Sequence, residues 1–319
     1  MPLLTGAVAV AVAAAVTFPT AEPVVIPLPV SPATANGLGV YSGPGEVGET
    51  NNFSSWLNRP VEATDYLDPA WTKWNPQALK RWGDWKNAKP GLKFTLGLHL
   101  VPEKGGSLTA GLRGAYDWHF RVLAQQLVSN GLGDSVIRLG YEPNNPNIGP
   151  WQGTSNPDGY KAMYRRAHGI LRSVAPNLKF DYNLAVGTSG KVISFWTLYP
   201  GSAYVDIVGL NIYDVWWAHY GATPWQRWNH TLTTKIGVND HKAFAKYVGK
   251  PVSYPEWGLY KKGDFYAGGG DSTFFIDRMA ELVKGAKYHA YFDLNWTNHG
   301  SKIDMFPQAK ARYKERFGG

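Results

Sequence analysis

Two glutamates, Glu142 and Glu256, are the residues of this 319-residue sequence best placed to do chemistry. Each ends a short apolar run, Ser135–Glu142 and Pro251–Glu256. Hydrolysis of a glycosidic bond needs one carboxylic acid to protonate the leaving oxygen and a second carboxylate to attack the anomeric carbon or to activate water. A single glutamate at a strand end is more often an ion-pair partner or a helix cap. The hypothesis that these glutamates hydrolyse a glycosidic bond therefore depends on the two acting as a pair.

The rest of the chain must bring these glutamates together, and its pattern predicts how. Short apolar runs alternate with helical patterns from Gly37 onward. The predicted strands are Gly37–Ser42, Ala63–Leu67, Leu92–Val101, Ser135–Glu142, Leu178–Val186, Val205–Tyr213, Pro251–Glu256 and His289–Trp296. The predicted helices are Pro76–Asn87, Ala115–Asn130, Asp158–Val174, Asp240–Val248, Thr273–Lys284 and Gln308–Phe317. Eight strands separated by helices over about 250 residues predict an α/β fold, a single (β/α)8 TIM barrel.

In such a barrel the active site lies at the carboxyl ends of the strands. Glu142 ends the fourth strand and Glu256 the seventh, and these strands lie roughly opposite each other across the mouth. Other polar and aromatic residues fall at the same ends: Tyr41, Asp65, His99, Asn183, Asn211, Tyr213, Asp293 and Trp296. We expect them to form one ring around the two carboxylates.

A doubly wound sheet is the competing architecture. It needs a glycine-rich phosphate loop after its first strand. Gly37-x-Gly39 lacks the third glycine at the required spacing, and the Ser-Gly-Pro-Gly that follows does not open a helix. The barrel is therefore preferred, as one catalytic domain over residues 36–319.

The composition narrows the chemistry. The chain holds 14 Trp, 18 Tyr and 13 Phe, and this content suits flat platforms for sugars as well as core packing. Cysteine is absent, which excludes disulfides and thiol nucleophiles. The sequence contains no H-E-x-x-H motif or histidine cluster, so we expect no metal and no cofactor.

The net charge of +8 is spread over single lysines and arginines, without a basic run or arm. This pattern argues against a nucleic-acid partner. It allows loose association with an anionic cell envelope through long-range attraction. We expect a monomer whose partner is a polysaccharide or oligosaccharide substrate.

Residues 1–35 form an apolar and Pro-rich leader. Leu3–Phe18 is too short for a comfortable membrane span, and the small residues Ala33-Thr34-Ala35 resemble a cleavage site. No Lys or Arg occurs before Arg59, so the leader lacks the basic start of a signal peptide. A signal peptide is the preferred interpretation and an uncleaved anchor the alternative. Either predicts a secreted or cell-envelope-associated protein.

The segments Ile137–Asn144 (IRLGYEPN) and Pro251–Gly258 (PVSYPEWG) resemble the two catalytic segments of family 26 glycoside hydrolases, and more closely those of an actinobacterial branch of family-26-like proteins. That family contains endo-β-mannanases and related β-glycanases, retaining enzymes of a large (β/α)8 clan. The resemblance covers residues 37–317 in strand order. It implies that Glu142 is the acid/base and Glu256 the nucleophile.

The resemblance implies further roles. Asn211-Ile212-Tyr213 matches a place where the clan has a Tyr bonded to the nucleophile, so Asn211 and Tyr213 are expected in the site. His99 matches a sugar-site His, although a packed or capping His is an equal alternative. Trp296 matches an indole that lies under the reacting sugar.

Tyr141 departs from the pattern, because family 26 mannanases typically have His before the acid/base. Residue 141 is expected beside the substrate, so the departure puts mannan specificity in doubt more than catalysis. Trp151 and Trp257, beside the glutamates, and Trp216 with Trp217 are the candidate platforms for outer sugars. A further set of tryptophans at helical spacing is expected to serve packing: Trp74, Trp82 and Trp85.

The leading hypothesis is a retaining, endo-acting glycoside hydrolase with its carboxyl groups about 5–5.5 Å apart. Its substrate is a β-mannan, a β-xylan, a β-glucan or a cell-envelope glycan. The alternative is a non-catalytic barrel that binds glycan through a Trp-rich cleft.

Overall fold

The computed structural model describes residues 37–67, 76–219, 221–263, 266–295 and 300–319. Eight parallel strands close into a barrel in the order β1-β10-β7-β6-β5-β4-β3-β2, which confirms the predicted (β/α)8 fold. The barrel strands are β1 (Leu38–Tyr41), β2 (Glu62–Tyr66), β3 (Phe94–Leu98), β4 (Val136–Leu139), β5 (Lys179–Ala185), β6 (Ile207–Tyr213), β7 (Val252–Gly258) and β10 (His289–Phe292). A small antiparallel pair, β8 (Lys262–Gly263) and β9 (Tyr266–Ala267), follows β7.

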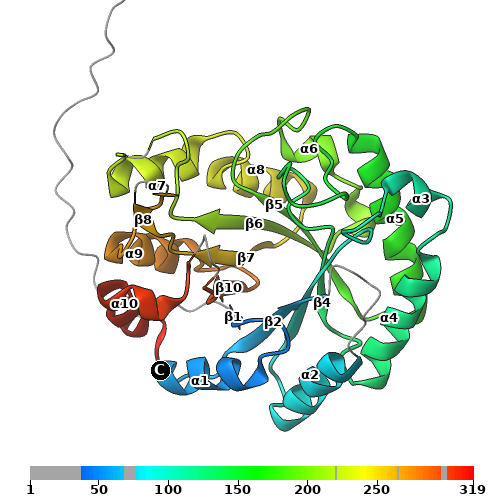
Figure 1. The fold of residues 1–319 in the computed structure, drawn as a ribbon, viewed down its shortest axis with the longest axis horizontal. Helices are drawn as coiled ribbons and strands as arrows, with labels where there is room; N and C mark the ends of the chain where they lie inside the picture. Colours follow the sequence, from blue (N-terminus) through cyan, green and yellow to red (C-terminus); the bar gives the residue numbers. More distant parts are fainter. Residues whose placement is uncertain (1–36, 68–75, 220, 264–265, 296–299) are drawn as a thin grey trace, which may run out of the picture.

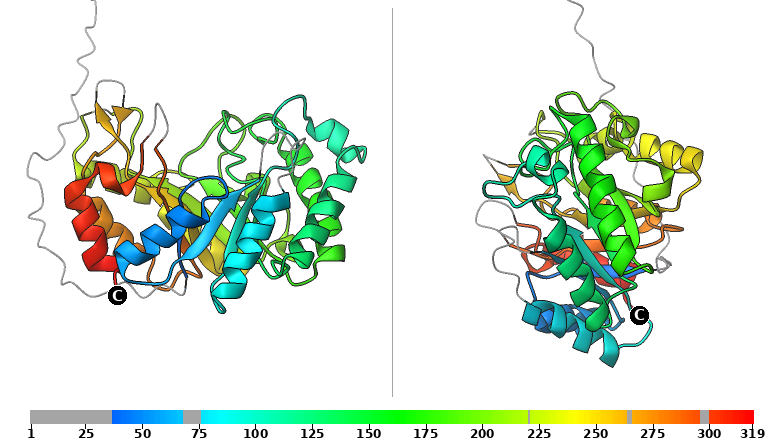
Figure 2. Two further views of the ribbon diagram at one scale, coloured as in Figure 1. Left: turned by 60° about the horizontal axis from the view of Figure 1, so that its bottom comes forward. Right: turned by 90° about the vertical axis from the view of Figure 1, so that its right-hand side faces the viewer.

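Helices surround the barrel (Figures 1 and 2). They are α1 (Val47–Leu57), α2 (Pro76–Ala88), α3 (Leu108–Leu112), α4 (Asp117–Ser129), α5 (Pro157–Val174), α6 (Phe195–Leu198), α7 (Pro224–Thr233), α8 (Val238–Val248), α9 (Thr273–Leu282) and α10 (Pro307–Phe317). The sequence pattern did not predict α1, α3, α6 and α7. Two of these are very short, α1 is rich in Asn and Ser, and α7 begins with a capping box formed by Thr223 and Gln226.

The alternation of side chains along β6 separates the core from the site. Val208, Leu210 and Ile212 are fully buried in the hydrophobic cluster, whereas Asn211 and Tyr213 bond to the carboxyl groups of Glu142 and Glu256. Successive residues of a strand point to opposite faces, so one face packs on the helices and the other fills the barrel. Hydrophobic burial stabilises the first face, and polar networks occupy the second.

The barrel interior contains a buried carboxyl, Asp181 of β5. Its Oδ2 accepts hydrogen bonds from Ser253 at 2.5 Å and Tyr288 at 2.6 Å. Burial raises the pKa of Asp181 to about 6. This group joins β5 to β7 and to the start of β10, below the mouth where the chemistry is expected.

Outside the barrel, aromatic side chains pack between strands and helices. Trp82 and Trp85 of α2 are buried, which confirms their packing role. Trp74 lies outside the described residues. In the described part of the chain, no helix combines the length and apolar character needed to cross a membrane.

Candidate active site

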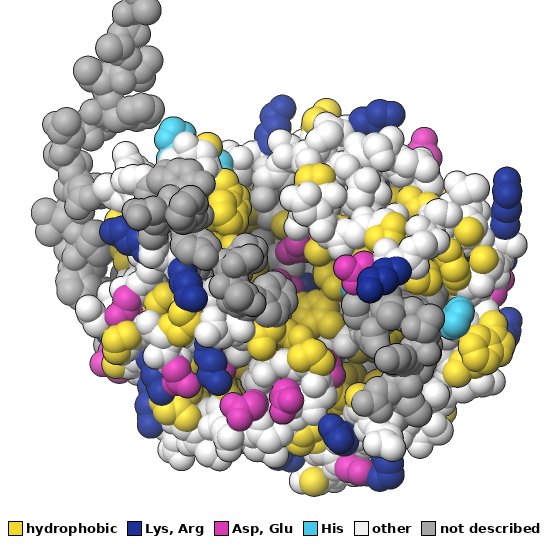
Figure 3. Space-filling model, in the orientation of Figure 1, with side chains coloured by type: hydrophobic (Ala, Val, Ile, Leu, Met, Phe, Trp, Pro, Cys, Tyr) yellow, Lys and Arg dark blue, Asp and Glu magenta, His cyan; other side chains and the backbone are white. Residues whose placement is uncertain are grey.

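A cleft of about 1470 Å³ opens at the carboxyl ends of the strands. Figure 3 shows hydrophobic side chains at the floor of this hollow, near the middle of the face. Both predicted catalytic glutamates line it, and so do six further predicted site residues: His99, Tyr141, Trp151, Asn211, Tyr213 and Trp216. The fold therefore brings residues of four strands, β3, β4, β6 and β7, and of the loops that follow them, to one place.

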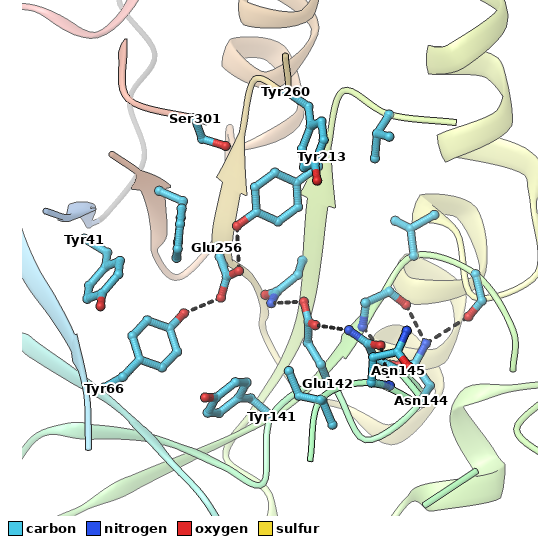
Figure 4. A pocket seen from close by; sticks show the side chains of 18 of the residues that line it. Tyr41, Tyr66, Tyr141, Glu142, Asn144, Asn145, Tyr213, Glu256, Tyr260 and Ser301 are labelled. Atoms are coloured by element: carbon cyan, nitrogen blue, oxygen red, sulfur yellow. Dashed lines mark hydrogen bonds between the residues drawn. The ribbon is translucent and has the colours of Figure 1, made fainter. Parts of the chain in front are cut away.

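Three donors hold the carboxylate of Glu256, at the end of β7. Tyr213 Oη donates to Oε1 at 2.6 Å, as expected. Arg138 Nη2 donates to Oε2 at 2.7 Å, and Tyr66 Oη donates to the same oxygen. Figure 4 shows the two tyrosines approaching Glu256 from two sides. These donors fix the orientation of the carboxylate and stabilise its charge.

Arg138 is a buried cation inside the barrel, with no solvent exposure. Its Nε and Nη2 donate to Asn183 Oδ1 at 3.0 and 2.8 Å, and Nη2 also lies 3.3 Å from Asn211 Oδ1. Nη1 donates to Tyr66 Oη. A buried charge needs such a set of partners. These hydrogen bonds fix the position of the guanidinium that also donates to Glu256.

Arg138 and Tyr66 were missed as site residues in the sequence. A signal existed for Arg138, because a charged residue in the apolar run Ser135–Glu142 requires a buried partner. The signal for Tyr66 was weaker, because the sequence pattern of β2 is only weakly that of a strand. In addition, the Tyr66 ring fits only because the residue paired with it on β3 is a glycine, Gly97. A Cβ on Gly97 would overlap the Tyr66 ring.

Glu142 follows β4 with a left-handed backbone, φ 49°. Glutamate rarely adopts this region, and such strain is concentrated at functional sites. Asn211 Nδ2 donates to its Oε1 at 2.6 Å, and Asn145 Nδ2 donates to its Oε2 at 3.1 Å. Burial, and then the charge of Glu256, raise the pKa of Glu142. The surroundings favour the protonated carboxyl.

The rings of His99, Tyr141 and Trp151 pack against one another beside the two glutamates. His99 Nε2 lies 2.7 Å from Tyr141 Oη, and Trp151 Nε1 donates to the Tyr141 carbonyl at 3.0 Å. The His99 and Trp151 rings stack with centroids 4.0 Å apart. His99 and Tyr141 thus reach the cleft as expected. Trp151 also lines it, although its indole is almost entirely buried in this stack.

The loop after β6 carries the remaining aromatic surface of the cleft. Trp216 lines it and stacks on His230 with centroids 4.5 Å apart. Trp217 lines it with 54% of its surface exposed, so its indole is available as a platform. Below this loop Arg227 Nε donates to the buried carboxylate of Asp214 at 2.7 Å.

The expectation that Trp257 forms a sugar platform is wrong. Its indole is fully buried on the outside of the barrel, stacked on Tyr313 of α10 and bonded to His289 Nδ1 at 3.0 Å. The reason is strand alternation: Glu256 points into the barrel, so its neighbour points to the helices. Trp296 lies outside the described residues and is not placed by the structure.

Within the described residues, no group of three or more His, Asp or Glu side chains is arranged to hold a metal ion. The two carboxyl groups of the cleft differ in their hydrogen-bond partners. One carboxyl is surrounded by neutral amides, and the other by a guanidinium and two phenols.

Comparison with solved structures identifies the class of fold. The chain superposes on an endo-β-1,4-mannanase of Cellulomonas fimi with a TM-score of 0.62 and 16% identity, over 87% of this chain and 70% of that one. A family 26 β-mannanase of Bacteroides ovatus gives 0.60 and 14%, over 88% and 89%. Two fungal β-1,4-galactanases give 0.58 and 13%, over 82% and 90%. At these identities the likeness establishes the fold, and it is the fold expected from the two glutamate segments.

Sequence comparison points the same way. The chain is 26% identical over 189 residues to the mannan endo-1,4-β-mannosidase of Bifidobacterium adolescentis. The match covers 56% of this chain and 18% of that relative, so the chain spans a small part of the relative's length. No family model matches the chain. The resemblance to an actinobacterial branch stays a prediction.

Proposed function

We propose that this chain is a retaining, endo-acting β-glycanase in which Glu142 is the acid/base and Glu256 the nucleophile. The observation that carries the proposal is the contrast between the two carboxyl groups of one cleft. Arg138 and two tyrosine hydroxyls donate to Glu256 and stabilise an anion. Neutral amides bind Glu142, whose pKa is raised. A nucleophile needs the first environment, and a proton donor needs the second.

The reaction proceeds in two steps. First, Glu142 gives its proton to the glycosidic oxygen while a carboxylate oxygen of Glu256 bonds to the anomeric carbon, and the bond to the leaving sugar breaks. Second, Glu142 takes a proton from water, whose oxygen attacks the same carbon and releases Glu256. Arg138 and Tyr213 keep Glu256 oriented through both steps. At the end Glu142 again carries its proton and Glu256 is again a free carboxylate, and one water has been consumed for each glycosidic bond cleaved.

The substrate class rests on different support. The relatives compared above are named as β-1,4-mannanases, a mannan endo-1,4-β-mannosidase and β-1,4-galactanases. A β-1,4-mannan is therefore the first candidate substrate. Tyr141 stands where mannanases typically have His, so β-xylan, β-glucan and envelope glycans stay in the panel. Trp216 and Trp217 are positioned to receive sugars beyond the cleaved bond.

The test is reducing-sugar release from linear β-1,4-mannan, β-1,4-xylan, β-glucans and envelope glycan. We expect release from at least one polymer and none from Glu142→Gln or Glu256→Gln. Size analysis of early products separates internal from terminal cleavage. Release that survives both substitutions contradicts the assignment of the pair.

The two roles are separated by rescue. Azide should restore turnover of Glu256→Ala with an inverted glycosyl azide product, and of Glu142→Ala with a retained one. A 2-deoxy-2-fluoro glycoside should leave its sugar on Glu256, detected by mass spectrometry of peptides. If the azide products of the two variants are reversed and the label is found on Glu142, then Glu142 is the nucleophile and Glu256 the acid/base. Label on neither residue argues against a covalent intermediate, as does inversion of the wild-type product.

A non-catalytic glycan-binding barrel is the second candidate, since the aromatic cleft alone suits binding. Affinity electrophoresis in the same polysaccharides distinguishes the two. Retardation of the wild-type protein without any sugar release favours the binding barrel. Wild-type release together with retardation of Glu256→Gln favours the enzyme.

We infer that residues 1–35 direct export, and that the protein acts outside the cell as a monomer. The net charge of +8 supports loose attachment to an anionic envelope. Fractionation of the producing cells into medium, envelope and cytosol tests the location. N-terminal sequencing of the mature protein then separates a cleaved leader from an anchor, and light scattering measures the oligomeric state.

A further inference from the structure

Tyr141 lies in the cleft beside Glu142, and its hydroxyl has a single hydrogen-bond partner among the described residues. That partner is His99 Nε2, at 2.7 Å. One proton lies between the two atoms. If Tyr141 donates it, the phenol has no proton left for a substrate. If His99 donates it, the phenolic proton is free.

The other nitrogen of His99 decides between these arrangements. Nδ1 is buried, and no described residue bonds to it. Burial lowers the pKa of His99 to about 4, so at neutral pH the ring carries one N–H. A proton on Nδ1 would be a buried donor without an acceptor, and such donors are rarer in proteins than unmatched acceptors. The proton therefore belongs on Nε2, where it meets the Tyr141 oxygen.

The Tyr141 ring is held on several sides. The Arg138 guanidinium lies 5.2 Å from its ring centroid, and the Tyr66 ring meets it edge-on at 5.1 Å. In Figure 4 the ring lies between Tyr66 and Glu142. Electrostatic interactions of its hydroxyl with both catalytic glutamates place it next to the reacting centre. A phenolic proton that is free at this point is available to a group in the cleft.

We propose that His99 donates its Nε2–H to Tyr141, and that Tyr141 thereby presents its own O–H to a hydroxyl group of the sugar at the cleaved bond. Tyr141 is then a specificity-determining donor, and His99 is a positioning residue that sets the direction of the phenolic proton. The inference rests on the proposed function. A site built to bond a sugar hydroxyl discriminates strongly against a sugar that lacks it.

The tautomer of His99 is measurable without any substrate. Nitrogen-15 NMR of the histidine-labelled protein should show a neutral ring protonated at Nε2, and His99→Gln identifies the signal by its loss. A ring protonated at Nδ1 overturns the proposal. This measurement does not depend on catalytic activity.

Kinetics test the consequence, with mannohexaose as the probe. Tyr141→Phe should lower kcat/KM about ten- to hundredfold. His99→Phe keeps a ring against Trp151 but removes the donor, and should have an effect of similar size. His99→Gln restores an N–H near the Nε2 position and should recover most of the activity. The double variant of His99→Phe and Tyr141→Phe should be no worse than Tyr141→Phe.

If the losses of kcat/KM in His99→Phe and Tyr141→Phe multiply in the double variant, the two residues act independently. That result overturns the proposed coupling between them. Wild-type kcat/KM in Tyr141→Phe, with Glu142→Gln inactive, overturns the donor role and leaves the proposed function intact. Failure of the proposed function has a different signature, because the wild-type protein then cleaves no glycan at all.

Discussion

Asn145→Ala is the perturbation that tests the proposed acid role of Glu142. The Asn145 amide donates to Glu142 Oε2 at 3.1 Å, and this bond lowers the pKa of the carboxyl against the opposing effects of burial and Glu256. Asn145 is half-buried and stands in a loop, so alanine fits without a core cavity. Loss of a donor that favours the anion must raise the pKa of Glu142.

The size of the shift follows from the bond. Hydrogen bonds to charged groups contribute about 1.5–3 kcal/mol. A long bond at a half-buried position belongs at the low end, about 1.5 kcal/mol, which corresponds to about one pKa unit. In the proposed mechanism Glu142 acts in its protonated form, so a raised pKa extends activity to higher pH. We expect the alkaline limb of kcat/KM to move upward by about one unit.

The assay is the pH profile of reducing-sugar release at low substrate concentration, which reports the free enzyme. Asn145→Asp adds a negative charge beside Glu142 and should move the limb further in the same direction. Gln152→Ala is the matched control, because it removes a bond to the Thr154 amide in the same loop without touching Glu142. An alkaline limb that stays in place in both Asn145 variants, or moves down, refutes the assignment of Glu142 as the acid.

Three further predictions concern positioning and stability. Tyr66→Phe removes one of three donors to Glu256, the proposed nucleophile, and should lower kcat about ten- to hundredfold, measured at saturating substrate. Gly269→Ala places a Cβ against the Asp214 carboxylate and should destabilise the fold by about 3 kcal/mol in urea unfolding, because a buried ion pair is disturbed. Asp181→Asn removes a carboxyl whose pKa is raised, so wild-type stability should fall relative to the variant by about 3 kcal/mol as pH rises from about 4 to 7.

The first two of these have matched control variants. Tyr182→Phe removes a buried hydroxyl that bonds Phe195 O at 2.7 Å, away from the cleft, and should leave kcat unchanged. Gly169→Ala lies on an exposed helix position with open space around it and should stabilise by about 0.5–1 kcal/mol. A kcat for Tyr66→Phe equal to that of Tyr182→Phe contradicts its positioning role. A pH-independent difference for Asp181→Asn contradicts the raised pKa.

The barrel and the two glutamates could be predicted because their signals are local. Apolar runs end in Glu142 and Glu256, and parallel strands bring their carboxyl ends to one mouth. Strand alternation was a further signal, and it would have placed Trp257 outside the barrel. The network around Glu256 was not predictable in the same way. Tyr66 and Arg138 meet there through a register between strands that the sequence does not encode locally.

The position of Tyr141 has a different physical origin. It precedes Glu142, and strict alternation would send one of the two away from the cleft. Gly140 and Glu142 instead have φ of 57° and 49°, so the chain turns after β4 and both side chains reach the cleft. The glycine hints at such a turn. A left-handed glutamate has no sequence signal.

Arg138 explains why the two glutamates of this cleft differ in their protonation. Although it shares β4 with the start of the Glu142 segment, its side chain bonds to Asn183 of the neighbouring β5 and reaches through the barrel interior to Glu256 of β7. One buried cation cannot neutralise two carboxylates. The pair is closest to neutral when one carboxyl keeps its proton, and that proton belongs to the carboxyl that the guanidinium does not reach. Replacing Arg138 should therefore disturb the proton on Glu142 as much as the orientation of Glu256.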